Sequence, residues 1–315
     1  TSSGKQVNGL QLGIVDVKAE LKKDSLETLL GRPFRFGKDF NVDIDVVKSA
    51  TIITENDTTF YLYDIYAKEA QSINLIFDKL FLPKHAKLYI YSDKQIYGPV
   101  TSEFNPKKEN EFWTDLIQGT KITLQVSVPK SSIEPIEIHI SKAIHGYNSN
   151  FSGFGESAVC NRDVACSEGS GWGNEANSVA MLLTSNGTTF CTGSLINNVC
   201  QNFTPYFLTA FHCLDSDSNG ALSTAETNNV ANWVFRFRYQ SSSCGGGDNT
   251  SFVSMNGSTF RAGFLNTDFS LLELSATAAS IRANNLTLAG WSRSTTAATS
   301  AVSIHHPNGD VKKIS

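Results

Sequence analysis

The residues best suited to chemistry lie in the stretch NFTPYFLTAFHCL, from Asn202 to Leu214. An apolar, strand-like run ends there at His212, and Cys213 follows directly. A general base that takes a proton from a hydroxyl needs an imidazole held on a rigid element. A strand end clamped by a disulfide at Cys213 would be such an element. We therefore expect His212 to be a catalytic base.

The best candidate partner for this imidazole is Asp268, in the stretch NTDFSLLEL. The apolar alternation after it is typical of a strand running into a core. A buried carboxylate that accepts the second ring N–H would select the tautomer of His212 and stabilise the imidazolium. The pattern alone equally suits an aspartate at a turn or at the start of a strand. The order of His before Asp favours the catalytic role.

A calcium-loop pattern begins directly after the histidine, from Asp215 to Glu226. Gly220 permits the sharp turn at the sixth position, and Glu226 can close the shell with both carboxylate oxygens. We expect an isolated structural calcium site beside the active site, followed by a helix over residues 224–233. The alternative is a solvated acidic turn without an ion. The expected ligands are Asp215, Asp217, Asn219, the backbone carbonyl of Ala221, Ser223 and Glu226.

Length and composition favour an exported protein with two domains. The chain has 315 residues, is 40% hydrophobic and carries a net charge of -4, which allows two cores and does not suit a nucleic-acid binder. All six cysteines lie between Cys160 and Cys244, as expected of a disulfide-bonded domain in an oxidising compartment. No apolar run approaches the roughly 20 residues of a membrane helix. The chain begins without an initiator Met or a signal peptide and ends in a strand-like region, so we expect a fragment.

The first half of the chain has the pattern of a β-sandwich. Short runs rich in Ile, Tyr, Phe and Val alternate with polar turns, which is typical of antiparallel strands. One helix is expected over residues 18–30, and the Gly-, Ser- and Asn-rich residues 146–155 suit a domain boundary open to proteolysis. We therefore expect one domain over residues 1–150 and a second over residues 151–315. The expected strands are residues 59–66, 72–77, 87–91, 121–128 and 134–140.

Motifs in the second half resemble those of lysyl endopeptidases, which are secreted trypsin-like serine proteases of bacteria. They are CNRDVAC, CTGSLINN, PYFLTAFHC, NTDFSLLEL, AGWSR and IHHPNGDVKKIS, in the order the family shows. The resemblance implies an all-β protein with a trypsin-like double β-barrel, of which the chain would hold the first barrel and the start of the second. It also implies that residues 1 to about 155 are a propeptide. The alternative is a permanently attached binding or folding domain.

The resemblance implies two disulfides. Cys191 would bond to Cys213, which would staple the base to the neighbouring strand, and Cys166 would bond to Cys244. The family pattern joins Cys160 to a cysteine outside these residues, and Cys200 departs from that pattern. Because six cysteines allow many pairings, the partners of Cys160 and Cys200 stay open.

The serine nucleophile of trypsin-like enzymes lies in a Gly-x-Ser-Gly context that this chain lacks. Ser194, Ser254 and Ser303 have other neighbours, and those of Ser194 indicate a strand. We expect the nucleophile, the oxyanion hole and the specificity pocket to lie beyond Ser315, so the chain alone would be inactive.

Together these features predict a secreted serine endopeptidase precursor that is monomeric and acts on protein or peptide substrates. The resemblance alone suggests cleavage after Lys. Calcium is the one expected cofactor, and neither a nucleic acid nor a membrane is an expected partner. Two alternatives stay open. One is a catalytically inactive, calcium-stabilised binding or adhesion protein with a protease-like fold, and the other is a purely structural adhesion module.

Overall fold

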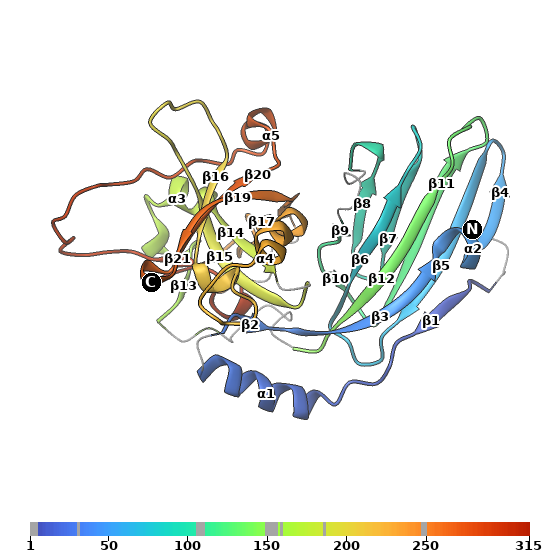
Figure 1. The fold of residues 1–315 in the computed structure, drawn as a ribbon, viewed down its shortest axis with the longest axis horizontal. Coiled ribbons are helices and arrows are strands. Elements are labelled where there is room, and N and C mark those ends of the chain that lie inside the picture. Colours follow the sequence, from blue (N-terminus) through green and yellow to red (C-terminus); the bar gives the residue numbers. More distant parts are fainter. Residues whose placement is uncertain are drawn as a thin grey trace. The chain divides into compact units, whose positions relative to one another are not determined.

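The computed structural model describes residues 6–29, 32–104, 111–148, 157, 160–184, 187–246 and 251–315. Strands dominate this part of the chain and helices are few and mostly short, which confirms the expected all-β class (Figure 1). The chain divides into two compact units. The first unit is Thr1–Glu20 with Gly37–Asn148, and the second unit is Leu21–Phe36 with Ser149–Ser315. No helix in the described residues combines the length and the apolar character that a membrane crossing requires.

The first unit is the predicted β-sandwich. Its two sheets follow the orders β1-β5-β11-β7-β8, with β4 beside β5, and β10-β6-β12-β3, with β9 beside β6. Ile65 and Leu124 from one sheet pack with Ile73 and Ile140 from the other in a single core, because alternate side chains of each strand point inward. The strands are β1 (Gly9–Gln11), β3 (Gly37–Asp45), β4 (Thr51–Glu55), β5 (Thr58–Tyr66), β6 (Ser72–Phe81), β7 (Lys87–Tyr91), β8 (Ile96–Val100), β9 (Phe112–Trp113), β10 (Ile117–Gln118), β11 (Lys121–Pro129) and β12 (Glu137–Gly146).

The predicted helix is present as α1 (Val17–Leu29), and a short helix α2 (Val46–Ser49) follows β3. Each predicted strand of the first half is also present, although β12 begins at Glu137 rather than at residue 134. The predicted boundary segment, residues 146–155, lies largely outside the described residues.

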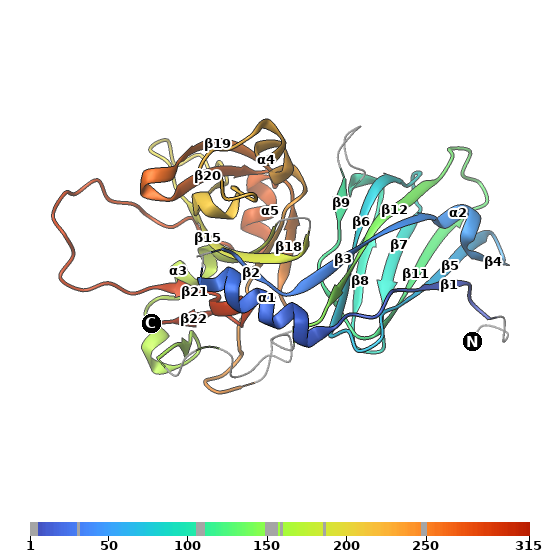
Figure 2. The same ribbon diagram turned by 60° about the horizontal axis from the view of Figure 1, so that its bottom comes forward.

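The second unit is built on one curled antiparallel sheet, which Figures 1 and 2 show from two sides. Its described strands follow the order β18-β17-β14-β15-β16-β20-β19, with β2 paired to β15. The rings of Phe207 and Phe235 meet edge to face at 5.0 Å in the core. The strands are β2 (Phe34–Arg35), β14 (Val179–Thr184), β15 (Thr189–Ile196), β16 (Tyr206–Thr209), β17 (Val234–Phe237), β18 (Val253–Asn256), β19 (Ser258–Phe264) and β20 (Phe269–Leu274).

Strand β20 begins directly after Asp268 and has the alternating burial that the sequence predicts. Ser270, Leu272 and Leu274 are buried, and the residues between them are partly exposed. A strand with this period of two places one set of side chains in the core and the other outside. Short helices α3 (Gly173–Ser178), α4 (Thr224–Asn229) and α5 (Ala278–Ala283) complete the unit.

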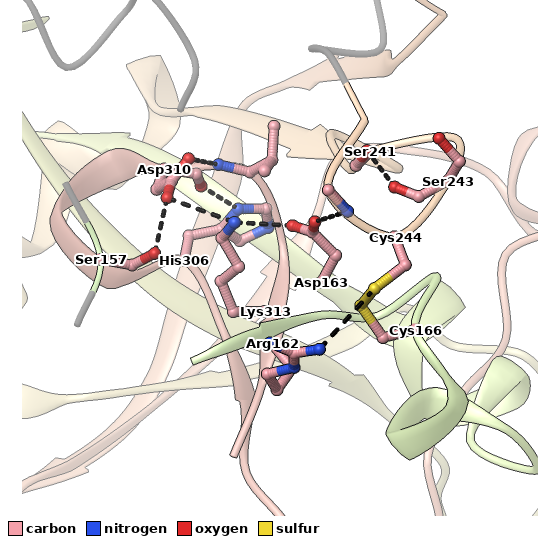
Figure 3. Close-up of polar contacts among 12 residues, drawn as sticks. Ser157, Arg162, Asp163, Cys166, Ser241, Ser243, Cys244, His306, Asp310 and Lys313 are labelled. Carbon is pink, nitrogen blue, oxygen red and sulfur yellow. Dashed lines mark hydrogen bonds and ion pairs between the residues drawn. A yellow bond between two sulfur atoms is a disulfide. The ribbon is translucent and has the colours of Figure 1, made fainter. Parts of the chain in front are cut away.

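A second, smaller sheet in this unit contains a buried ion-pair network (Figure 3). The Lys313 ammonium lies 2.6 Å from Asp163 and 3.5 Å from Asp310, and all three side chains are buried. The Ser157 hydroxyl donates to Asp310 at 2.8 Å, and the Gly245 N–H donates to Asp163 at 2.9 Å. The network therefore joins Ser157 and Asp163 to the last segment of the second unit. The strands of this sheet are β13 (Arg162–Asp163), β21 (Ile304–His305) and β22 (Lys313–Ile314).

Candidate active site

His212 lies in a short 3-10 turn, Phe211–Cys213, that follows directly on β16. A disulfide joins Cys213 to Cys191 on β15, with a Cα–Cα distance of 6.3 Å. The hydroxyl of Thr209 at the end of β16 donates to the Thr192 carbonyl at 2.9 Å. The turn that carries the imidazole is therefore tied to the neighbouring strand by a covalent bond and by a side-chain hydrogen bond.

The Asp268 carboxylate contacts His212 at two places. Its Oδ2 atom lies 2.8 Å from the ring Nδ1, and its Oδ1 atom accepts the His212 backbone N–H at 3.0 Å. The Asp268 backbone carbonyl also accepts the Phe211 N–H at 3.2 Å. An ionised carboxylate only accepts hydrogen bonds, so the neutral ring carries its proton on Nδ1 and leaves Nε2 as an acceptor. This is the tautomer that a general base requires.

The prediction that Asp268 is buried is wrong. Its side chain is 51% exposed, and that of His212 is 48% exposed. Asp268 ends the 3-10 turn Leu265–Thr267 in a left-handed backbone conformation, with φ 47°, one residue before β20 begins. It therefore sits at the rim of the sheet, outside the alternation that buries the later residues of the strand. Two directed hydrogen bonds orient the pair here without burial of the carboxylate.

The serines considered from the sequence lie apart from this pair. Ser194 belongs to β15, where its hydroxyl lies 2.7 Å from that of Ser178. Ser254 lies within β18, and the backbone of Ser303 pairs with that of Ser315. Within the described residues, the ring of His212 hydrogen-bonds only to Asp268. These residues thus supply an imidazole and a carboxylate that hydrogen-bonds to it.

A cavity of about 300 Å³ adjoins the imidazole. Its lining residues include Cys191, Cys213, His212 and, unexpectedly, residues 32–34, together with His306, Asn308 and Gly309. His306 is buried, with Nδ1 2.9 Å from the Asp310 carbonyl. Burial and the nearby Lys312 charge hold the pKa of His306 well below its ordinary value, so this ring stays neutral. The arrival of residues 32–34 at the cavity was missed from the sequence, because a two-residue strand has no readable period.

The loop after His212 brings three of its carboxylates close together. Oxygen atoms of Asp215, Asp217 and Glu226 lie within 4.8 Å of one another. Gly220, at the turn position, has φ +81°, which is unfavourable for residues with a Cβ. Asp215 accepts the backbone N–H groups of Asn219 and Gly220 at 3.0 and 2.9 Å. Three of the six predicted ligands, the carboxylates of Asp215, Asp217 and Glu226, are thus brought close together by the folding of the loop itself.

Glu226 is also part of the N-terminal cap of helix α4. Ser223 caps α4, and the two residues form a capping box. Partial burial works to raise the pKa of Glu226, but hydrogen bonds donated by Ser223 and Ser216 outweigh it and lower the pKa to about 2. The helix itself ends at Asn229, and a 3-10 turn, Val230–Asn232, replaces its predicted last part. The carboxylate is therefore ionised under any physiological condition, as a metal ligand must be.

The remaining cysteines divide into one pair and two free thiols. Cys166 is bonded to Cys244, with a Cα–Cα distance of 4.5 Å. Both disulfides are therefore the pairs that the family resemblance implies. Cys160 and Cys200 are exposed, and neither is bonded within the described residues.

Comparisons with known proteins agree with the motifs around the site. Residues 154–315 match the family described as lysyl endopeptidase, C-terminal domain. A lysyl endopeptidase from Pseudomonas aeruginosa is 30% identical over 223 residues, which cover 65% of this chain and 45% of that protein. The chain thus spans less than half the length of this curated relative. The matched family region contains His212, Asp268, both disulfides and the acidic loop. The chain belongs to the lysyl endopeptidase family, and its second unit has the trypsin-like, all-β architecture.

Proposed function

We propose that this chain is part of a serine endopeptidase, with His212 as general base and Asp268 as the residue that orients it. The observation that carries the proposal is the 2.8 Å contact between Nδ1 of His212 and Oδ2 of Asp268. Membership of the lysyl endopeptidase family supports a protease function. The exposed site suits protein or peptide substrates, which must reach the base from solvent.

The geometry supports an acyl-transfer mechanism. Nε2 of His212 would take the proton of a serine hydroxyl as the serine oxygen attacks the peptide carbonyl. Asp268 would stabilise the imidazolium that forms through the contact at Nδ1. The imidazolium would then give its proton to the leaving amine as the C–N bond breaks. Water would repeat the sequence on the acyl-enzyme, again with His212 as base.

The nucleophile and the specificity pocket would be supplied by a region of the whole protein beyond residue 315. This is consistent with a chain that covers 45% of its P. aeruginosa relative. Cleavage after Lys is proposed only because that relative is described as a lysyl endopeptidase. The first unit would serve as the prodomain of a secreted zymogen, and the two disulfides support an oxidising compartment.

The acidic loop would bind calcium and stiffen the segment after the base. The support is the complete ligand spacing from Asp215 to Glu226 together with the convergence of three carboxylates. Asp217 is the exposed member of the three, and among the described residues its carboxylate accepts hydrogen bonds only from Asn219. Calcium would supply a fixed positive charge there and have no role in the acyl transfer.

The full-length protein with and without His212→Ala tests the proposed function. We expect hydrolysis of a lysyl p-nitroanilide by the wild type, and a loss of kcat of roughly 10⁴-fold or more in the variant. Ser194→Ala is the matched control, since this hydroxyl bonds to Ser178 and should leave kcat unchanged. Absence of activity in a correctly folded wild type would favour the inactive, protease-like binding protein. A large loss of kcat in Ser194→Ala would show that the assignment of the nucleophile is wrong.

A further inference from the structure

We propose that residues 32–36 form an intramolecular inhibitory strand, which occupies a peptide-binding edge of β15 beside His212. The inference rests on the proposed peptidase function and assigns a role to a segment outside the family-matched region. Its basis is the position of one short strand, β2, within the second unit.

The part of the β15 edge that pairs with β2 is not covered by β16. β16 pairs only with the last part of β15, from Ser194 to Ile196. On that side of the earlier part of β15, Thr189 is opposite Arg35 and Phe190 is opposite Phe34 in an antiparallel register. The Phe36 N–H continues the ladder and donates to the Thr188 carbonyl at 3.0 Å. Such main-chain pairing accepts any extended peptide, so the same edge would hold a substrate strand.

Two aromatic side chains anchor the strand. Phe34 and Phe36 are two residues apart and therefore project to the same face of β2. The ring of Phe36 is fully buried and stacks on Phe190 with a centroid distance of 4.2 Å and an interplanar angle of 11°. The ring of Phe34 is stacked relative to the same Phe190 ring, with a centroid distance of 6.3 Å and an interplanar angle of 10°. The edge of β15 thus binds β2 through aromatic stacking on Phe190 as well as through backbone hydrogen bonds.

A helix secures the other face of the strand. The Arg35 guanidinium lies 2.7 Å from the Asp24 carboxylate on α1, and both side chains are largely buried. The part of α1 from Leu21 onward belongs to the second unit, together with β2. The strand is therefore held by the sheet on one side and by an ion pair on the other, which favours stable occupancy over transient contact.

The strand leads directly to the imidazole. β15 passes from Phe190 to Cys191, whose disulfide holds the turn that carries His212. Arg32, Pro33 and Phe34 line the same cavity as His212. One edge accommodates one strand at a time, so a substrate that pairs there must displace β2. Occupancy by the chain's own segment would keep substrates from the base until that segment is removed.

A peptide experiment tests whether the segment competes with substrate. The probe is a synthetic peptide of residues 17–37, added to the processed full-length enzyme with a lysyl p-nitroanilide linked to an extended peptide. We expect an increase in apparent KM with kcat unchanged, and at least tenfold weaker inhibition by the peptide with Phe34→Asp. Inhibition that lowers kcat alone, equal potency of the two peptides, or no inhibition would overturn the proposal.

A second readout needs no catalysis, so failure of the inhibitory strand can be distinguished from failure of the proposed function. Hydrogen exchange is followed in the unprocessed protein carrying Phe34→Asp or Arg35→Ala, each at a partly exposed position. We expect faster exchange confined to residues 32–36 and 188–192. Phe81→Asp, at an exposed phenylalanine of the first unit, is the control and should leave these amides protected. Unchanged protection in both β2 variants would exclude a strand that is held there by these contacts.

Discussion

Asp268 holds His212 by its ring and by its backbone at the same time, at 2.8 Å and 3.0 Å. A single carboxylate therefore sets both the tautomer of the imidazole and the position of the turn that carries it. These two functions can be separated by substitution, because an amide keeps one oxygen acceptor while it replaces the other oxygen with a donor.

Asp268→Asn should lower kcat by roughly 10⁴-fold, the effect of the analogous change in a well-studied triad. The amide NH₂ would face Nδ1 and favour the tautomer with the proton on Nε2, which cannot act as a base. The retained oxygen can still accept the His212 backbone N–H, so the melting temperature should be almost unchanged. The measurement is steady-state kinetics of the full-length enzyme, with Asp57→Asn, in an exposed turn of the first unit, as control. A kcat within tenfold of the wild type would contradict the orienting role.

Calcium should raise the melting temperature of the protein, and Asp217→Ala should abolish that rise. At a calcium concentration about 100 times the dissociation constant, the expected stabilisation is roughly 2.7 kcal/mol. Asp217 is preferred to Asp215 or Glu226 because those two also accept hydrogen bonds that hold the loop. Thermal unfolding is compared in calcium and in a chelator, with Asp57→Ala as control. Identical melting curves of the wild type under both conditions would reject the site.

Lys313→Met should destabilise the second unit by about 3–5 kcal/mol, because it leaves the Asp163 and Asp310 carboxylates buried without their cation. The triple variant Asp163→Asn, Asp310→Asn and Lys313→Met should lose less free energy of unfolding, since none of these three side chains then carries a buried charge. Urea unfolding measures both, with the exposed Lys87→Met as control. The network would not be a stabilising contact if Lys313→Met unfolded at the same urea concentration as the wild type.

Lys312 should make the stability of the protein dependent on pH above neutrality. Its side chain is fully buried, and its ammonium donates to the Ala176 carbonyl at 2.6 Å. Burial, with a smaller contribution from the Arg238 charge, lowers the pKa of Lys312 to about 7. The unfolded chain, whose lysine has an ordinary pKa of about 10.4, binds more protons between these values. The free energy of unfolding should therefore gain up to about 1.4 kcal/mol per pH unit above pH 7 from this group.

Denaturant unfolding at pH values between about 6 and 9, a range that includes the Lys312 transition, measures this gain. Lys312→Met lacks the titrating group, so its curve should rise less steeply than that of the wild type. Parallel curves for the two proteins would show that Lys312 is not responsible for the pH dependence.

The local pattern of the sequence contained most of the strands, and it singled out His212 and Asp268, which the structure brings into contact. Alternation after Asp268 predicted a strand whose every second residue is buried, and β20 has this pattern. The calcium-loop spacing also lies within one short segment, so its carboxylates converge through local turns alone. Such features depend on residues that are neighbours in the chain, and their periods and spacings can be read directly.

The burial of Asp268 was misjudged because burial depends on what covers a residue, and the end of a strand is covered by other parts of the fold. The alternation that buries Leu272 does not extend to a residue in the turn before the strand. A position at the rim is therefore a property of the curled sheet and not of the motif.

Only the tertiary structure decided which distant segments meet. Lys313 reaches Asp163 across 150 residues, and Phe36 stacks on Phe190 although neither residue belongs to a motif. Such contacts follow from sheet order and register, which depend on the summed packing of many side chains. The sequence by itself therefore determined the chemical groups of the candidate site, whereas the fold decided their exposure and placed residues 32–34 beside His212.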